Sequence, residues 1–376
     1  MTDSKQLHEQ AFVADLHCDT ALLMKRGYDL AERHRENHVD IPRLHEGGVN
    51  LQVFACFLDS DIPQERHVSA TDELIDTALQ GIETYSADLS LCTTAREARD
   101  IAATGGIAVV IGIENGMALG GELANVERFY QRGVRYLTLI HNVSNEWCVS
   151  ANDTIPSFDG LTDFGRDVVR EMNRVGMIVD VSHVHPLGVD KVLEVTSKPI
   201  IASHSCAHAL CPHPRNLTDS QIKAIADNGG MIGMNFHGDF VSERRWEISK
   251  SLAEKSPEVV EELKGLLFGK YEGAEYEERY NRLQPTIKEW TETISFVNAT
   301  VEDVVDHIDR MVDLVGSEYV GLGSDFDGIW LPPAGLEDCS KFSNLTEELV
   351  KRKYRDNDIE NVLGRNFLRV FEEVCG

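Results

Sequence analysis

The chain has 376 residues, with 36 Lys and Arg against 63 Asp and Glu, and a formal net charge of −27 at pH 7. Such a charge repels nucleic-acid backbones and anionic lipid surfaces, so it excludes nucleic acid and membranes as expected partners. Hydrophobic residues make up 42% and charged residues 26%, a globular balance that excludes an extended disordered chain.

No targeting signal is evident in the sequence. Residues 1–9 (MTDSKQLHE) are polar, and the final residues (FEEVCG) lack the hydrophobic tail of a lipid-anchor signal. We therefore expect a soluble, cytoplasmic protein. Its 8 Cys contain no Cys-x-x-Cys pair, and we expect reduced thiols that serve mainly as small buried hydrophobic side chains.

Short apolar and β-branched runs alternate along the chain with segments of helical period, which is typical of repeated βα units. Eight such runs match the strand number of a (β/α)8 TIM barrel, so we predict one α/β barrel domain over residues 1–376. The predicted strands are residues 12–19 (FVADLHCD), 51–57 (LQVFACF), 107–114 (IAVVIGIE), 135–141 (RYLTLIH), 177–183 (MIVDVSH), 199–204 (PIIASH), 230–236 (GMIGMNF) and 319–325 (YVGLGSD).

Two of the intervening helices have clear signals. Residues 161–175 carry an apolar stripe that ends at Gly176, a residue suited to a helix C-terminus. Residues 300–315 carry a second stripe, and Thr300 can cap that helix. Residues 238–298, between the seventh predicted strand and its helix, are rich in Glu, Lys and Tyr and predict a helical insertion. Whether this insertion covers the site, builds the interface of an expected homodimer or does neither stays open.

Ligand-type side chains end several of the predicted strands. Catalytic residues of a TIM barrel come from the C-terminal ends of its strands, so these side chains should converge. A single Asp or His at such a place more often caps a helix, but the joint pattern favours a metal site. The six proposed ligands are His17, Asp19, Glu114, His183, His204 and Asp325, and His141 is a further histidine at a strand end.

Six ligands exceed the three protein ligands of one catalytic zinc, so the set predicts two ions. In such a pair a carboxylate, for example Glu114, could bridge both ions together with a hydroxide. Two Zn²⁺ suit the mixed imidazole and carboxylate set, and Mn²⁺ or Co²⁺ are expected substitutes.

The chain also carries a series of motifs: DLHCD at 15–19, HVDIPRLHEGGV at 38–49, IGIENG at 111–116, YLTLIHN at 136–142, DVSHV at 180–184, SHS at 203–205, PRN at 214–216, GSDFDG at 323–328 and GLEDCSKF at 335–342. In these motifs the sequence resembles the membrane dipeptidase (renal dipeptidase) family of the amidohydrolase superfamily. The resemblance covers nearly the whole chain, and only residues 238–298 fall clearly outside it.

The resemblance implies a metal role for five of these residues. Glu114 would bridge two zinc ions, His17 and Asp19 would complete the first site, and His183 and His204 the second. Each of them also admits the plainer interpretation that a strand-end side chain caps or braces the barrel.

It also implies three roles in catalysis and substrate binding. Asp325 would act as general base and acid beside the bridging hydroxide, and His141 would contact the carbonyl oxygen as charge develops on it. Arg215 would pair with the free carboxylate of the substrate. Without the resemblance, Arg215 could be a surface residue and His141 could hydrogen-bond within the barrel. His237 stands where mammalian relatives carry an aromatic residue, which leaves the side-chain preference open.

The resulting hypothesis is a binuclear zinc metallopeptidase that hydrolyses dipeptides, including L-D dipeptides, by attack of a metal-bridging hydroxide. One alternative is another amidohydrolase-type amide hydrolase that acts on an N-acyl amino acid or a lactam. A second alternative is a non-enzymatic metal-binding scaffold with residues 238–298 as its partner surface. The complete ligand set argues against the scaffold, because a degenerate member is expected to lose at least one ligand.

Overall fold

The strands of the protein close into a barrel. The computed structural model describes residues 3–267, 270–271 and 273–376. Within these residues nine parallel strands follow the order β2-β1-β9-β8-β7-β6-β5-β4-β3. An additional pairing between β2 and β4 closes the ring of strands. The strands are β1 Val13–Cys18, β2 Val49–Phe57, β3 Leu89–Leu91, β4 Ile107–Glu114, β5 Val134–Thr138, β6 Ile178–Asp180, β7 Ile201–Ser205, β8 Met231–Met234 and β9 Val320–Leu322.

The predicted (β/α)8 TIM barrel is confirmed, with β3 as an additional strand outside the ring. The closing register between β2 and β4 runs from Leu51 beside Ala108 to Phe57 beside Glu114. The short β3 lies against the beginning of β4, ahead of the point where β5 starts to pair. A run of three residues shows no measurable alternation, which is why the sequence did not predict it.

Six strands are shorter than predicted, namely β1, β5, β6, β7, β8 and β9. The strands β5, β6 and β9 end before His141, His183 and Asp325, so the predicted extension of these strands to those residues is wrong. His183 has φ +67° and Asp325 has φ +64°, a left-handed conformation that no regular strand contains. The chain therefore turns at the barrel mouth just before these two side chains.

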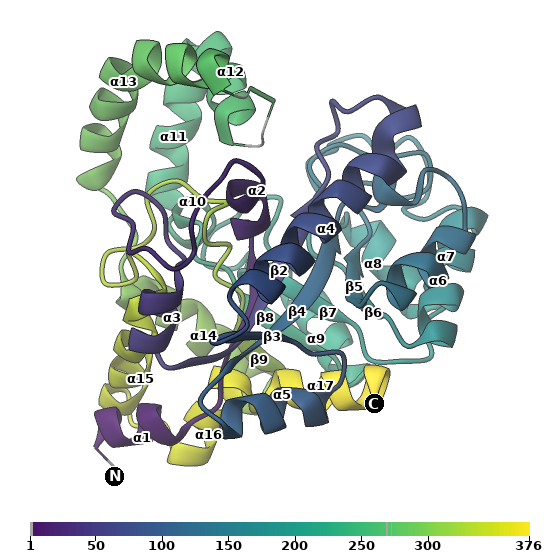
Figure 1. Cartoon of the computed structure of the whole chain (residues 1–376), viewed down its shortest axis with the longest axis vertical. Helices are drawn as coiled ribbons and strands as arrows, with labels where there is room; N and C mark the ends of the chain where they lie inside the picture. The colour runs from purple at the N-terminus through teal and green to yellow at the C-terminus, as the bar shows by residue number, and fades with distance from the viewer. Residues whose placement is uncertain (1–2, 268–269, 272) are drawn as a thin grey trace.

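Helices surround the barrel, and the two helices predicted in detail are confirmed (Figure 1). Gly176 ends α7 with φ +88°, and the side chain of Thr300 accepts a hydrogen bond from the N–H of Asp303 at the start of α14. The helices are α1 Ser4–Gln10, α2 Thr20–Lys25, α3 Ile41–Glu46, α4 His67–Thr84, α5 Ala95–Ala103, α6 Ala124–Gln131, α7 Asp163–Val175, α8 Pro186–Leu193, α9 Asp219–Asp227, α10 Gly238–Val241, α11 Glu243–Lys255, α12 Pro257–Leu267, α13 Gly273–Ser295, α14 Val301–Val315, α15 Phe342–Lys351, α16 Asp356–Glu360 and α17 Asn366–Cys375.

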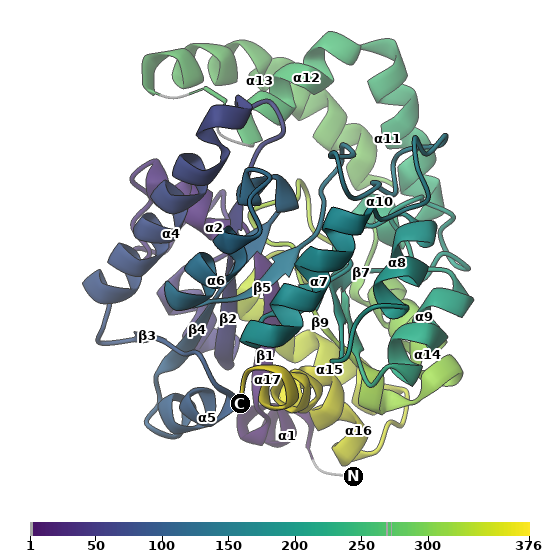
Figure 2. The same cartoon turned by 90° about the vertical axis from the view of Figure 1, so that its right-hand side faces the viewer.

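The predicted insertion is helical: α10 to α13 lie between β8 and α14. These helices rise above the end of the barrel at which α2 follows β1 (Figures 1 and 2). The guanidinium of Arg26, just after α2, donates to the carbonyl oxygen of Leu267 at 3.2 Å and lies 5.5 Å from the ring centre of Tyr276. Lys270 pairs with Asp61, beyond β2, at 3.0 Å. The insertion thus reaches from β8 to the loops after β1 and β2.

The interior of the barrel is filled by side chains. Leu16, Val53, Val110 and Tyr136 belong to one buried cluster that continues to Phe367 on α17. Figure 2 shows α17 below the strands, at the end opposite the insertion. The barrel is therefore closed at this end, and a site for chemistry must lie at the other.

The cysteines and helices add two further findings. The eight cysteines are free thiols, and all except Cys375 are buried, as predicted. Among the residues described, none of the helices combines the length and the apolar character needed to cross a lipid bilayer.

Candidate metal centre

The predicted ligand residues converge around Glu114, the last residue of β4. Its Oε1 lies 3.0 Å from Nε2 of His183 and 3.5 Å from Nε2 of His204. Its Oε2 lies 3.5 Å from Nε2 of His17. The two oxygens of this carboxylate therefore face different side chains: Oε2 faces the first set, which contains His17, and Oε1 faces the second set, His183 and His204. A carboxylate between two cations requires this arrangement.

The first set contains two buried polar atoms without a hydrogen-bond partner. Nε2 of His17 lies 3.7 Å from Oδ2 of Asp19, and neither Nε2 of His17 nor Oδ1 of Asp19 has a partner. Ligand atoms of His17, Asp19 and Asp325 lie within 4.8 Å of one another. An unsatisfied buried polar atom is costly, typically about 1–3 kcal/mol. A divalent cation would satisfy these atoms, so the donor set fits a metal.

In the second set, neighbouring groups fix the protons on the imidazoles. The hydroxyl of Ser203 donates to Asp180 at 2.6 Å, so it accepts from Nδ1–H of His204 at 2.8 Å. The amide oxygen of Asn142 accepts from Nδ1–H of His183 at 3.1 Å. Both Nε2 atoms therefore carry lone pairs, yet they lie only 3.0 Å apart. Two lone pairs cannot bond each other, and a cation between them and Glu114 would supply the missing partner.

Burial keeps three of the four histidines of the cluster neutral, whereas the pKa of His17 is raised well above its usual value despite burial, by Tyr136 and the carboxylate of Glu114. Removal from water holds the pKa of His183 and of His204 well below the usual value and lowers the pKa of His141 to about 3. Metal binding requires neutral imidazole, so these three side chains are ready to act as ligands or as hydrogen-bond partners at neutral pH. His141 lies with its ring centre 4.4 Å from that of His183, and it forms a ligand-like group with Glu114 and His183.

Arg215 lies beside the second set, with part of its hydrogen-bonding capacity unused. It is only 3% exposed, its Nη2 donates to the carbonyl oxygen of His204 at 3.2 Å, and its Nε has no partner. Burial lowers its pKa to about 10, which still leaves it charged at neutral pH. The guanidinium lies 5.5 Å from the ring centre of Phe240. A buried cation with an unpartnered N–H is suited to bind an anionic group of a ligand.

Sequence reasoning missed several residues around these groups. Asn235 donates to Asp325 at 2.9 Å, and Phe240 packs against both His213 and His237, with ring centres 4.5 and 4.2 Å away. Asn235 follows the C-terminus of β8, where polar residues of a barrel gather, and that position was the available signal. His185 lies outside the cluster of ligand atoms, and its side chain accepts from the N–H of Leu187 at the start of α8.

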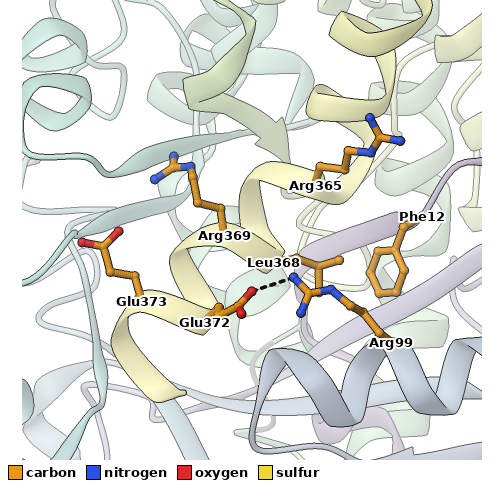
Figure 3. A pocket seen from close by; sticks show the side chains of 7 residues that line it. All are labelled: Phe12, Arg99, Arg365, Leu368, Arg369, Glu372 and Glu373. Atoms are coloured by element: carbon orange, nitrogen blue, oxygen red, sulfur yellow. Dashed lines mark hydrogen bonds and ion pairs between the residues drawn. The ribbon is translucent and has the colours of Figure 1, made fainter.

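A hollow lies at the end of the barrel covered by α17, away from this cluster (Figure 3). Its volume is about 680 Å³, and Arg99 pairs there with Glu372. Arg369 donates to the carbonyl oxygens of Gly229 and Gly230. These two arginines already have partners, and none of the six predicted metal ligands lines the hollow. We therefore place the candidate functional site at the barrel mouth.

Comparison with known proteins decides the family. The family model described as membrane dipeptidase (peptidase family M19) matches residues 1–375. The chain belongs to the membrane dipeptidase family. The resemblance predicted from the motifs is therefore confirmed. Membrane dipeptidases are metallopeptidases, so membership makes this protein a hydrolase of the dipeptidase class and implies a metal cofactor.

Relatives of this membrane dipeptidase match along most of their length. An uncharacterized dipeptidase of Schizosaccharomyces pombe is 31% identical, over 98% of this chain and 82% of its own. The probable dipeptidase PvdM from Pseudomonas aeruginosa has a TM-score of 0.82 at 24% identity, over 99% of this chain and 97% of that chain. A metallopeptidase from Rhodobacter sphaeroides, solved with a phosphinate mimic of the dipeptide L-Ala-D-Ala, has a TM-score of 0.78 at 24% identity, over 97% and 99%.

Proposed function

We propose that this protein hydrolyses dipeptides with two zinc ions bound at the barrel mouth. The observation that carries the proposal is the buried carboxylate of Glu114, which faces His17 with one oxygen and His183 and His204 with the other. His17 and Asp19 would hold the first ion, His183 and His204 the second, and Glu114 both, with Asp325 as a further ligand of the first. When bound, zinc supplies a water activated for attack at neutral pH and polarises the carbonyl of the scissile bond.

The residues of the chain would then handle protons and charge. Asp325 would accept the proton of the attacking water and pass it to the nitrogen of the leaving amine, since its carboxylate lies beside His17 and Asp19 at the proposed site of the first ion. His141 is neutral and would donate a hydrogen bond to the carbonyl oxygen as negative charge develops on it.

The proposed substrate is a dipeptide with a free carboxylate. Arg215 would bind that carboxylate close to the metal pair, so only a short substrate places its peptide bond within reach. The insertion above the mouth supports the same restriction in length. We extend the proposal to L-D dipeptides because the Rhodobacter sphaeroides neighbour was solved with a mimic of L-Ala-D-Ala.

The test is a panel of L-L dipeptides, L-D dipeptides and N-acyl amino acids incubated with the zinc-loaded protein. We expect release of free amino acids from dipeptides, two equivalents of zinc by elemental analysis, and no turnover by Glu114→Gln. Preferred cleavage of N-acyl amino acids would replace the dipeptidase proposal with the deacylase alternative. A folded wild type that binds no zinc and cleaves nothing would favour the scaffold.

A further inference from the structure

A tyrosine inside the barrel lies directly below the candidate metal centre. Tyr136 on β5 is fully buried, and its ring rests against Gly112, its register partner on β4. A Cβ at position 112 would lie 2.3 Å from Cζ of Tyr136. Gly112 does not have positive φ, so the glycine is required there for space and not for its backbone conformation. The barrel wall thus has a notch that fits the phenol ring.

The hydroxyl of this tyrosine has a defined direction of hydrogen bonding. It lies 2.9 Å from Nδ1 of His17 and donates to the carbonyl oxygen of Leu16 at 3.2 Å. A phenol has one proton, and Leu16 takes it, so the oxygen must accept from Nδ1–H of His17. In neutral His17 the lone pair is then on Nε2, which faces Glu114 at 3.5 Å and has no hydrogen-bond partner.

We propose that Tyr136 is a positioning residue that fixes the tautomer and ring orientation of His17 for metal binding, with Gly112 as the space that admits it. The inference rests on the proposed zinc function. The two other imidazoles of the cluster have their own acceptors, Asn142 and Ser203. His17 is fully buried, so water cannot easily take over the role of the phenol.

The first test is Tyr136→Phe, which removes the acceptor and keeps the ring. Loss of a partner of this kind typically weakens metal affinity by about 10- to 100-fold. In a titration against a competing chelator, we expect the affinity for one of the two zinc equivalents to fall by that factor, while the affinity for the other stays unchanged. Zinc-saturated Tyr136→Phe should retain the KM of the wild type. The matched control is Tyr28→Phe, which loses a hydroxyl bonded to the carbonyl oxygen of Val39, away from the cluster, and should bind zinc as the wild type does.

Two further measurements separate positioning from a purely structural role. In metal-free wild type with ¹⁵N-labelled histidine, at a pH high enough to make His17 neutral, we expect the Nδ1–H tautomer of His17, and the Nε2–H tautomer would overturn the inference even if the variant fails to fold. Gly112→Ala should displace the ring and weaken the same zinc equivalent as Tyr136→Phe. Unchanged affinity of both equivalents in Tyr136→Phe would also overturn it. A wild type that binds no zinc would instead refute the proposed function.

Discussion

The side-chain amide of Asn235 holds the carboxylate of Asp325 in one orientation. Its Nδ2 donates to Oδ2 of Asp325 at 2.9 Å, and its Oδ1 accepts from the N–H of His237 at 2.5 Å. The second bond fixes which end of the amide faces Asp325, so the carboxylate always meets a donor at Oδ2. In the metal-free protein burial raises the pKa of Asp325 to about 7, and in the proposed mechanism this carboxyl exchanges a proton with the attacking water.

Asp325→Asn should abolish this exchange while changing little in size. We expect kcat for Ala-Ala to fall by about 10²- to 10⁴-fold, the usual contribution of general acid and base catalysis. At least one zinc equivalent should remain, because Glu114, His183 and His204 are untouched. Steady-state kinetics and elemental analysis of the same sample check both statements. Wild-type kcat in this variant would remove Asp325 from the mechanism.

Arg215→Ala should act on substrate binding. A charge-assisted hydrogen bond contributes about 1.5–3 kcal/mol, so we expect KM for Ala-Ala to rise by about 10- to 150-fold with a smaller change in kcat. For the wild type, KM should rise by a comparable factor when Ala-Ala is replaced by its C-terminal amide. The variant should have similar KM values for the acid and the amide. Arg96→Ala is the control, because the Arg96 side chain is 88% exposed. If Arg215→Ala leaves the ratio of the two KM values unchanged, Arg215 does not bind the carboxylate of the substrate.

Removal of zinc should destabilise the fold. A ligand that binds only the folded state stabilises it by about 2.7 kcal/mol per site at a hundredfold excess over Kd. We therefore expect chelation to lower the Tm in scanning calorimetry and added zinc to restore it. Glu114→Gln should show a smaller difference between the two conditions, since Glu114 faces both ligand sets. A chelated wild type that melts at the same temperature as the zinc-loaded protein would be incompatible with the predicted sites.

Acid should destabilise the metal-free protein through His213. Burial lowers its pKa to about 3, against about 6.5 in the unfolded chain. Below pH 6.5 the unfolded state binds a proton that the folded state does not, so the free energy of unfolding decreases as the pH falls toward 3. Between pH 8 and pH 5.5 the loss is about 1 kcal/mol for this one group. In urea titrations at the two pH values, the free energy of unfolding of His213→Phe should decrease by about 1 kcal/mol less than that of the wild type. Equal decreases in both proteins would show that His213 does not contribute.

The bridge from the insertion to Arg26 should affect substrate length more than stability. Arg26→Ala with Lys270→Ala removes the contacts to Leu267, Tyr276 and Asp61. Surface ion pairs contribute about 0–1 kcal/mol, so the Tm should change little. If the insertion limits access, the ratio of kcat/KM for Ala-Ala-Ala to that for Ala-Ala should rise by about tenfold. An unchanged ratio would show that these contacts do not control length selection.

The barrel and the ligand types were predictable from local patterns. The apolar runs that contain His17, Glu114 and His204 have the period of buried strands, and these three residues lie within or at the end of their strands. Asp325 and His183 were predicted to lie at the ends of strands, but the chain leaves the strand before it reaches them. Periodicity cannot detect a left-handed residue that redirects a side chain at the barrel mouth.

By itself, the sequence determined the order of βα units, the helical insertion and which residues could bind metal, because these depend on composition and short-range period. The tertiary structure alone decided which oxygen of Glu114 faces which histidine. It also decided that Tyr136, from a strand that the sequence marks only as apolar, lies beneath His17. The contact between His17 and Tyr136 joins residues 119 positions apart, and its geometry depends on barrel closure and on the notch at Gly112.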